Sequence, residues 1–301
     1  MIYKSKSFAV PEEKIVRVIV DTDAKNEADD QFAIVQAMLS PKFDNVGFIA
    51  THFGKDGSMR KSYEELELIF KIAGCPHDDL IKHGAEHALC SKTGPEVSEG
   101  AELIVSEAMK DDPRPLYVLS LGAITDLASA YLMEPRIAKR LTAIWIGGGA
   151  YPYGGREFNL CNDINAANVV FSSGLDLWQV PKNVYEMMAV SFTELAYRIA
   201  GKNAVGDYLF RQLCEENFRA VKSNFRSGET WVLGDSPAVG LVLYEHRFCF
   251  DYTRAPEVGL SGEYLQSQFN PPIRVYRSID SRLVLEDFYA KVALFDPEGW
   301  R

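Results

Sequence analysis

An apolar run followed at once by four aspartates is the feature that most restricts what this chain can fold into. In residues 16–32, VRVIVDTDAKNEADDQF, the run from Val16 to Val20 predicts a buried strand, and the residues after position 28 predict a helix. Four carboxylates fall where the two elements meet, at Asp21, Asp23, Asp29 and Asp30. Carboxylates this close repel one another, and burial strengthens the repulsion. The pattern therefore indicates a positive charge that the polypeptide itself does not supply.

Extended and helical segments alternate along the chain, as in parallel sheets whose strands are joined by crossover helices. Strands are expected at residues 16–20, 45–54, 116–122, 140–149 and 175–181. Helices are expected at residues 28–41, 62–74, 98–110 and 162–174. We therefore predict an α/β fold, with a mostly parallel, doubly wound sheet and flanking helices. No internal repeat, low-complexity segment or linker divides the sequence, which favours a single domain over residues 1–301.

The overall charge of the chain is acidic. Lys and Arg number 32 against 42 Asp and Glu, a formal net charge of −10, which argues against nucleic acid or an anionic membrane as a partner. A small molecule or a cation fits better. The five cysteines form no Cys-x-x-Cys pair, and the first residues lack the apolar region of a signal peptide. No stretch reaches membrane-spanning length, so we expect a cytoplasmic protein.

In doubly wound sheets, ligands bind beyond the carboxyl ends of the strands, and the unusual residues of this chain stand at those ends. They are Asp21 and Asp23, residues 51–54, Leu121 and Gly122, and residues 147–149. A hard divalent cation such as calcium, with oxygen ligands, would screen the carboxylates from one another. On these residues alone two alternatives stay open. Asp29 and Asp30 could be helix caps, or Asp21 could be the nucleophile of a haloacid-dehalogenase phosphatase.

Five segments, of which the Asp-rich stretch is the first, occur in a fixed order and extend the pattern over nearly the whole chain. They read IVDTDAKNEADDQFAI, SLGAITDLASA, AIWIGGGA, REFNLCNDINAANVVFSSG and LGDSPAVG, with VYRSIDSRLVLEDF near the C-terminus. Together they resemble the nucleoside hydrolase family, the inosine-uridine type, whose first segment usually reads Asp-x-Asp-Pro-Gly-x-Asp-Asp. This chain carries two extra residues between the two aspartate pairs. The resemblance implies a nucleoside hydrolase-like fold.

Calcium is the cofactor that this resemblance implies. Its ligands would be Asp23, both carboxylate oxygens of Asp30, the main-chain carbonyl of Leu121, and Asp235. Asp23 would also be the general base, drawing a proton from a water aimed at the anomeric carbon of a ribosyl substrate. The carboxylates would stabilise the positive charge that develops on the sugar in the transition state.

The resemblance also implies which residues hold the sugar. Asp29, Asn159 and Asp235 would bind the 2′- and 3′-hydroxyls, which makes ribose the expected sugar. Glu157 would bind the 5′-hydroxyl. Taken singly, Asn159 could cap a turn, Glu157 could form a surface ion pair, and Asp235 could begin a helix. The candidates for stacking on the base are the aromatic residues Trp231, Trp178, Tyr151, Tyr153, Tyr185 and Phe53, of which Trp231 is preferred.

Departures from the family's pattern concern the substrate. Lys55 stands where the family often has asparagine, and Gly234 stands where relatives place histidine or tryptophan before the last metal aspartate. A side chain that protonates the leaving group is therefore not expected at position 234. His83 and His87 have a spacing found in zinc sites, but their glycine-containing segment is more typical of a surface loop.

We therefore expect a calcium-dependent hydrolase of ribonucleosides or related ribosyl compounds. Water would attack directly, without a covalent intermediate, and the resemblance suggests a homodimer or homotetramer. Three alternatives remain at this stage. They are a metal-dependent phosphohydrolase of the haloacid-dehalogenase type, a non-catalytic calcium- or sugar-binding homologue, and a hydrolase of another ribosyl compound.

Overall fold

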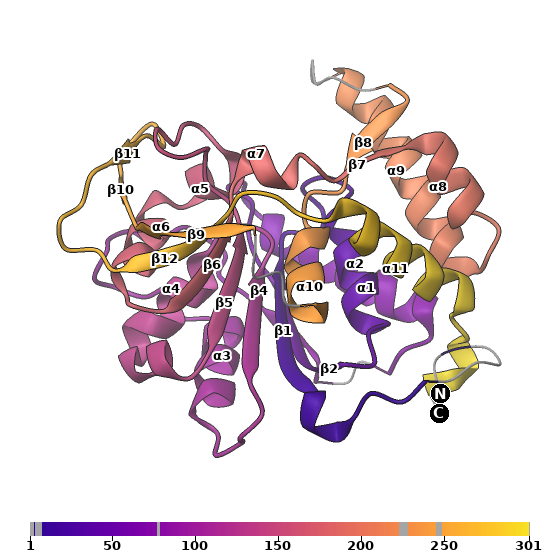
Figure 1. Cartoon of the computed structure of the whole chain (residues 1–301), viewed down its shortest axis with the longest axis horizontal. Helices are drawn as coiled ribbons and strands as arrows, with labels where there is room; N and C mark the ends of the chain where they lie inside the picture. The colour runs from indigo at the N-terminus through magenta and orange to yellow at the C-terminus, as the bar shows by residue number, and fades with distance from the viewer. Residues whose placement is uncertain (1–2, 4–7, 77–78, 223–227, 245–248, 301) are drawn as a thin grey trace.

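An eight-stranded sheet forms the centre of the molecule (Figure 1). The computed structural model describes residues 3, 8–76, 79–222, 228–244 and 249–300. Across the sheet the strands are β3 (Ile81–His83), β2 (Phe43–Ala50), β1 (Val16–Thr22), β4 (Leu116–Ser120), β5 (Thr142–Ile146), β6 (Asp176–Val180), β12 (Pro272–Tyr276) and β9 (Phe250–Arg254). Neighbouring strands are parallel except for β12 and β9. The predicted α/β class with a mostly parallel sheet is confirmed.

Side chains of the central strands alternate between two apolar cores, one on each face of the sheet. Val18 and Val20 of β1 belong to one core, and Ile19 belongs to the other. The first core is covered by α1 (Asp30–Met38), α2 (Ser58–Ala73), α9 (Ala204–Lys222), α10 (Ser236–Leu243) and α11 (Ser281–Leu294). The second is covered by α3 (Glu99–Met109), α4 (Thr125–Met133) and α6 (Ile164–Ser172). Both faces are buried, which explains why the central strands are rich in apolar residues.

The expected strands and helices are present, with their ends shifted by a few residues. Ser98 caps α3 by accepting a hydrogen bond from the backbone N–H of Ala101, as a capping serine does. Gly74 ends α2 in the left-handed conformation, at φ 63°. Strand β2 ends at Ala50, so the expectation of a strand through residues 51–54 was wrong. Shorter elements complete the fold: α5 (Phe158–Asn162), α7 (Lys182–Tyr185), α8 (Phe192–Arg198), the pair β7 (Ala189–Ser191) and β8 (Thr230–Val232), and the pair β10 (Glu257–Val258) and β11 (Tyr264–Leu265).

The order of the sheet places its switch point between β1 and β4. On one side of that point the chain runs outward through β2 and β3, and on the other side through β5 and β6. The loops that leave β1 and β4 therefore diverge to opposite faces and open a crevice at the carboxyl edge of the sheet. In Figure 1 this is the upper edge, beneath α5 and α7.

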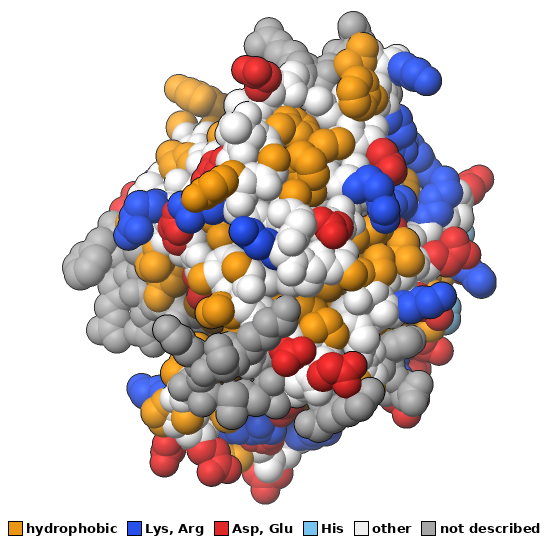
Figure 2. All heavy atoms as spheres, turned by 90° about the vertical axis from the view of Figure 1, so that its right-hand side faces the viewer, with side chains coloured by type: hydrophobic (Ala, Val, Ile, Leu, Met, Phe, Trp, Pro, Cys, Tyr) orange, Lys and Arg blue, Asp and Glu red, His pale blue; other side chains and the backbone are white. Residues whose placement is uncertain are grey.

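Charged and apolar side chains share the outer surface on the side of the molecule shown in Figure 2. Figure 2 shows the side of the molecule that carries α8, α9 and α11, where acidic and basic side chains lie interspersed with apolar ones. Across the described residues, every helix is too short or too polar to span a bilayer.

Candidate active site

A cavity of about 440 Å³ opens at the switch point of the sheet. Its wall combines residues that follow β1, β4 and β5 with residues from α5, α7 and the start of α10. The lining residues are Asp23, Asn26, Glu27, Asp29, Asp30, Leu121, Ile146, Glu157, Phe158, Asn159, Lys182, Tyr185, Glu186, Val232, Gly234 and Asp235. Eight of the residues singled out from the sequence, seven as ligands of metal or sugar and Tyr185 as an aromatic candidate, thus meet in one place.

Three aspartates converge at one end of the cavity. Asp29, Asp30 and Asp235 each present a carboxylate oxygen, and these oxygens all lie within 4.8 Å of one another. Helices α1 and α10 pack together, and each begins at this point, which brings Asp30 and Asp235 together from distant parts of the sequence. Asp29 and Asp235 occupy the N-cap positions, yet neither side chain accepts a capping hydrogen bond. Helix capping therefore does not account for these two carboxylates.

Asp23 lies in the floor of the cavity, directly after β1. Its side chain is buried, and the described residues offer no hydrogen-bond partner to its Oδ2. The carboxylate is held against Gly122, where a Cβ atom would lie only 2.6 Å from Oδ1 of Asp23. A residue without a side chain is thus required after β4 to leave room for Asp23.

The carboxylates of the cluster destabilise one another's charged forms. Burial, followed by the charges of Asp30 and Asp29, raises the pKa of Asp23 well above its usual value. Burial, followed by Glu27 and Asp30, does the same to the pKa of Asp29. The pKa of Asp235 is also raised, by burial and then by Asp29 and Asp30. Burial raises the pKa of Asp30 to about 6, while its hydrogen bond from Thr22 opposes the rise. A bound cation would reverse all of these shifts.

The donor atoms at this end of the cavity suit a hard cation. They are carboxylate oxygens and a backbone carbonyl, the ligand types that calcium prefers, and Asp23, whose Oδ2 has no partner among the described residues, lines the same cavity. Neither a thiolate nor an imidazole is found among the described lining residues, so the set does not resemble a zinc site. The residues present fit calcium.

The carbonyl of Leu121 is held in place by Asn159. Nδ2 of Asn159 donates to the carbonyl oxygens of Leu121, at 2.6 Å, and of Ile146, at 2.8 Å. One side chain thus fixes the ends of β4 and β5 relative to each other. The amide of Asn159 points its nitrogen at the sheet, which fixes its orientation in the cavity wall.

Glu157 is buried at the N-terminus of α5 and accepts four hydrogen bonds. Its Oε2 accepts from the backbone N–H groups of Gly148, at 2.7 Å, and Leu160, at 2.9 Å. Its Oε1 accepts from the backbone N–H of Asn159, at 3.2 Å, and from the hydroxyl of Tyr185, at 3.1 Å. The alternative interpretation of Glu157 as part of a surface ion pair is therefore excluded, because the side chain is a buried cap.

Tyr185 fills the space beside Gly234. A Cβ atom on Gly234 would lie 3.1 Å from Cδ2 of Tyr185 and 3.3 Å from Oδ2 of Asp29. The same Oδ2 accepts a hydrogen bond from the backbone N–H of Gly234 at 3.0 Å. Burial, followed by the charge of Glu157, raises the pKa of the Tyr185 hydroxyl above its usual value, so it remains a donor. A side chain at position 234 would therefore crowd the aromatic ring from α7.

Trp231, the preferred stacking residue, lies elsewhere. Its ring is buried in the core beside β7, and the described cavity wall contains Val232 in its place. Alternation of side chains along β8 places neighbouring residues on opposite sides, which is the physical reason. Of the six aromatic candidates, Tyr185 is the one in the described wall. Sequence reasoning also missed the lining residues Asn26, Glu27, Phe158, Lys182 and Glu186.

Residues 51–54 were expected to face the crevice, and the structure places them beneath it. Thr51 donates to Asp126, and the ring of His52 is hydrogen-bonded to Thr125 at 2.9 Å. His52 is buried, and burial lowers its pKa to about 4. This segment therefore belongs to a polar network under the site. Lys55 is exposed and lies over the ring of Phe53.

Asp21 and the two surface histidines also lie away from the cavity. Asp21 is fully buried in β1, and neither of its oxygens has a hydrogen-bond partner among the described residues. His83 stacks on Tyr63 and pairs with Glu99, and His87 is exposed. The interpretation of these histidines as surface residues is confirmed. A nucleophile must be reached by the substrate, and Asp21, unlike Asp23, is not part of the described cavity wall, which argues against the phosphatase alternative.

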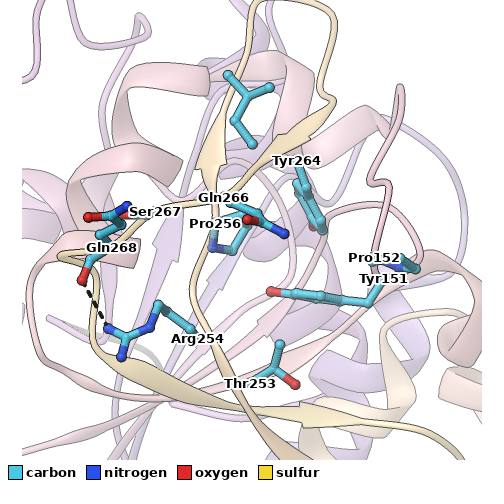
Figure 3. A pocket seen from close by; sticks show the side chains of 10 residues that line it. Tyr151, Pro152, Thr253, Arg254, Pro256, Tyr264, Gln266, Ser267 and Gln268 are labelled. Atoms are coloured by element: carbon cyan, nitrogen blue, oxygen red, sulfur yellow. Dashed lines mark hydrogen bonds between the residues drawn. The ribbon is translucent and has the colours of Figure 1, made fainter.

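A second cavity, of about 510 Å³, has a different character (Figure 3). Its wall consists of Tyr151, Pro152, Thr253, Arg254, Pro256, Tyr264, Leu265, Gln266, Ser267 and Gln268. The hydroxyl of Tyr151 donates to Gln179, and the guanidinium of Arg254 donates to the carbonyl of Gln268. The described wall has no carboxylate, so the acidic cavity remains the candidate active site.

Comparison with known proteins agrees with this geometry. The family model for inosine-uridine preferring nucleoside hydrolases matches residues 18–286. The chain is 26% identical over 224 residues to a probable uridine nucleosidase 2 of Arabidopsis thaliana, covering 65% of this chain and 68% of that protein. It is 28% identical over 208 residues to uridine nucleosidase 1 of the same plant, covering 60% of each protein.

Solved structures show the same fold at lower identity. A plant nucleoside hydrolase, PpNRh1, superposes with a TM-score of 0.76 at 17% identity and covers 92% of this chain and 99% of its own. A purine-preferring ribonucleoside hydrolase from Gardnerella vaginalis gives 0.74 at 18% identity, covering 92% and 98%. The matching sequence model, the relatives and the fold agree, and they support N-glycosidic hydrolysis of nucleosides. The chain belongs to the inosine-uridine preferring nucleoside hydrolase family.

Proposed function

We propose that this protein is a calcium-dependent hydrolase of ribonucleosides or closely related ribosyl compounds, with Asp23 as the general base. The observation that carries the proposal is the convergence of Asp29, Asp30 and Asp235 to within 4.8 Å, in a cavity that is also lined by Asp23, whose Oδ2 has no partner among the described residues. Two of the relatives described above are uridine nucleosidases by name, and they support the substrate class.

Asp23, Asp30, Asp235 and the carbonyl of Leu121 are the proposed calcium ligands. When bound, calcium would polarise a water and the vicinal hydroxyls of a ribose. Asp23 has the place of a base, since it lines the cavity and its Oδ2 has no hydrogen-bond partner among the described residues. Asn159 would keep the Leu121 carbonyl in position through the hydrogen bond already described.

The sugar would lie between the aspartates and Glu157. We propose that Asp29, Asp235 and Asn159 bind the 2′- and 3′-hydroxyls, with Glu157 toward the 5′ end. The carboxylates around the ring would then stabilise the positive charge of an oxocarbenium-like transition state, in a cavity where water is largely replaced by protein. Trp231 is not retained as the stacking residue because it is buried in the core. Tyr185 takes its place in the proposal.

Neither Gly234 nor Tyr185 offers the leaving group an acid. Gly234 has no side chain to donate a proton, and the hydroxyl of Tyr185 is engaged in a hydrogen bond to Glu157. A base that leaves as a poor anion is therefore disfavoured, and a hydrolase of another ribosyl compound is the second candidate. General acid catalysis is typically worth about 10² to 10⁴ in rate.

An assay of released reducing sugar tests the proposal. Purified protein is incubated with uridine, inosine, 2′-deoxyuridine and p-nitrophenyl riboside, each with added calcium and with a chelator. We expect hydrolysis of the ribosides, loss of activity in chelator, and much faster turnover of p-nitrophenyl riboside, whose aglycone leaves unaided. Calcium binding without any turnover would identify a non-catalytic homologue, and phosphate release from phosphate esters would favour the phosphatase alternative.

Gly122→Ala is expected to lower turnover by about a hundredfold, because small displacements of reacting groups have effects of that order. The added methyl group would lie 2.6 Å from Oδ1 of Asp23 and must push that carboxylate aside. Gly228→Ala is the matched control, since no heavy atom lies within 4 Å of its Cβ position. Steady-state kinetics of both variants checks this, and unimpaired Gly122→Ala would show that Asp23 need not stay where it is.

A further inference from the structure

We propose that Tyr185 occupies the acceptor on Glu157 that a substrate's 5′-hydroxyl would use, so that the enzyme accepts ribosyl compounds without a 5′-hydroxyl. This inference rests on the proposed function, because it concerns the sugar end of the same cavity. It names a substrate class, the 5′-deoxyribosides, and a residue that determines specificity. Tyr185 is separated by 28 positions from Glu157 and reaches it from α7.

The carboxylate of Glu157 is fully occupied by donors among the described residues. A carboxylate offers about four lone-pair sites, and Glu157 receives four donors from its own chain. Three are backbone N–H groups, of Gly148, Asn159 and Leu160, which are fixed by α5 and by the turn after β5. The fourth is the hydroxyl of Tyr185, 3.1 Å from Oε1. A substrate hydroxyl can donate to Glu157 only by displacing one of these donors, and Tyr185 is the one side chain among them.

Tyr185 is held in place by its ring and by its backbone. Its ring is held between Glu157 and Gly234, since a Cβ on Gly234 would lie 3.1 Å from Cδ2 of the ring. Its backbone is anchored in α7, where its N–H donates to the carbonyl of Pro181 at 3.1 Å. The turn continues as Met188 donates to the carbonyl of Tyr185 at 3.0 Å. The absence of a side chain at Gly234 thus leaves room for the ring of Tyr185.

The position of Tyr185 determines what a substrate's 5′-hydroxyl would contact. A 5′-hydroxyl would find the neutral oxygen of Tyr185 rather than the free charge of Glu157. Hydrogen bonds to charged groups contribute more than those between neutral groups. Loss of the 5′-hydroxyl should therefore cost this enzyme little, whereas removal of the Tyr185 hydroxyl should expose Glu157 and create a preference for it.

Binding of transition-state mimics tests the inference without relying on turnover. The probes are 1,4-dideoxy-1,4-imino-D-ribitol and its 5-deoxy derivative, and their Kd values are measured by calorimetry in calcium. For the unmodified protein we expect the two Kd values to agree within about fivefold, the range of a neutral hydrogen bond. For Tyr185→Phe we expect the hydroxylated probe to bind better than the deoxy probe by about tenfold to a hundredfold, as for a bond to a charged acceptor.

Tyr151→Phe is the matched control. It removes another tyrosine hydroxyl bond, the one to Gln179 at 2.8 Å, from the wall of the second cavity. Its ratio of the two Kd values should equal that of the unmodified protein. A strong preference for the 5-hydroxyl in the unmodified protein, or an unchanged ratio in Tyr185→Phe, would overturn the inference alone. Failure of both probes to bind any variant would instead overturn the proposed function, and the inference with it.

Discussion

Asp23→Asn is expected to lower kcat/KM for ribosides by at least about a thousandfold while the protein stays folded. Loss of a general base typically costs about 10² to 10⁴ in rate, and this variant also loses a proposed calcium ligand. Little packing is lost, because asparagine has nearly the same shape. Turnover of p-nitrophenyl riboside and the melting temperature measured on the same samples check both halves of the prediction.

The melting temperature of Asp23→Asn in chelator should not fall together with its activity. In chelator the side chain of Asp23 is a buried carboxylate among acidic neighbours, and burial and charge oppose its ionisation. Its replacement by a neutral amide should leave the melting temperature in chelator unchanged or higher. A variant that had merely unfolded would show a fall instead.

Asp21→Asn is the control for this experiment. Asp21 lies two residues earlier on the same strand, is fully buried, and is not part of the described cavity wall. We expect this variant to keep its activity within about tenfold of the unmodified protein, as for a residue that takes no part in the proton transfer. If Asp21→Asn were inactive and Asp23→Asn active, the assigned roles would have to be exchanged.

The parts of the site that could be predicted from the sequence are those that the sheet itself positions. Asp23 and the Leu121 carbonyl follow β1 and β4, and parallel strands bring their carboxyl ends to one edge. Asp30 and Asp235 begin the two helices that pack together over that edge. Hydrophobic periodicity locates such strand ends and helix starts, so the motif residues meet as expected.

The parts that were missed depend on irregular segments. Tyr185 belongs to a helix of four residues after β6, and no periodicity fixes the direction of its side chain. Trp231 was judged by its distance in sequence from Asp235, although the alternation along β8 turns it into the core. Residues 51–54 were misplaced because polar side chains at a strand end can equally satisfy one another beneath the site. The single domain and the oligomeric state stay predictions.

Aspartates in N-cap positions differ in this protein in whether they cap the helix. An aspartate before a helix is normally a cap, as Asp163 and Asp280 are here, each accepting from a backbone N–H in the first turn. Asp29 and Asp235 hold the same position without using it. These two carboxylates are thus available to another ligand, and calcium is the ligand that we propose.

Calcium is expected to stabilise this protein strongly at pH 8 and weakly at pH 5, and the difference follows from the acidic cluster. Burial raises the folded-state pKa of Asp30 from 3.8 to about 6 and that of Glu27 from 4.5 to about 7. A carboxyl group with a raised pKa stabilises the folded protein while it is protonated, below its unfolded pKa. That stability is lost as the pH rises through the folded pKa. In chelator the cluster should therefore destabilise the protein progressively between about pH 4 and pH 7.

Bound calcium should remove this penalty, because it competes with protons for the same oxygens and favours the ionised carboxylates. At calcium concentrations of about 100 times Kd, binding adds about 2.7 kcal/mol to the free energy of unfolding. Melting temperatures at pH 5 and pH 8, each measured with calcium and with chelator, give the rise in melting temperature that calcium causes at each pH. The difference between the paired samples cancels other titrations, such as that of the buried His52, whose lowered pKa acts in the opposite direction. Asp235→Asn should sharply reduce the calcium-induced shift of the melting temperature at pH 8. A shift that is equal at both pH values, or that zinc produces and calcium does not, would mean that the aspartate cluster is not a calcium site.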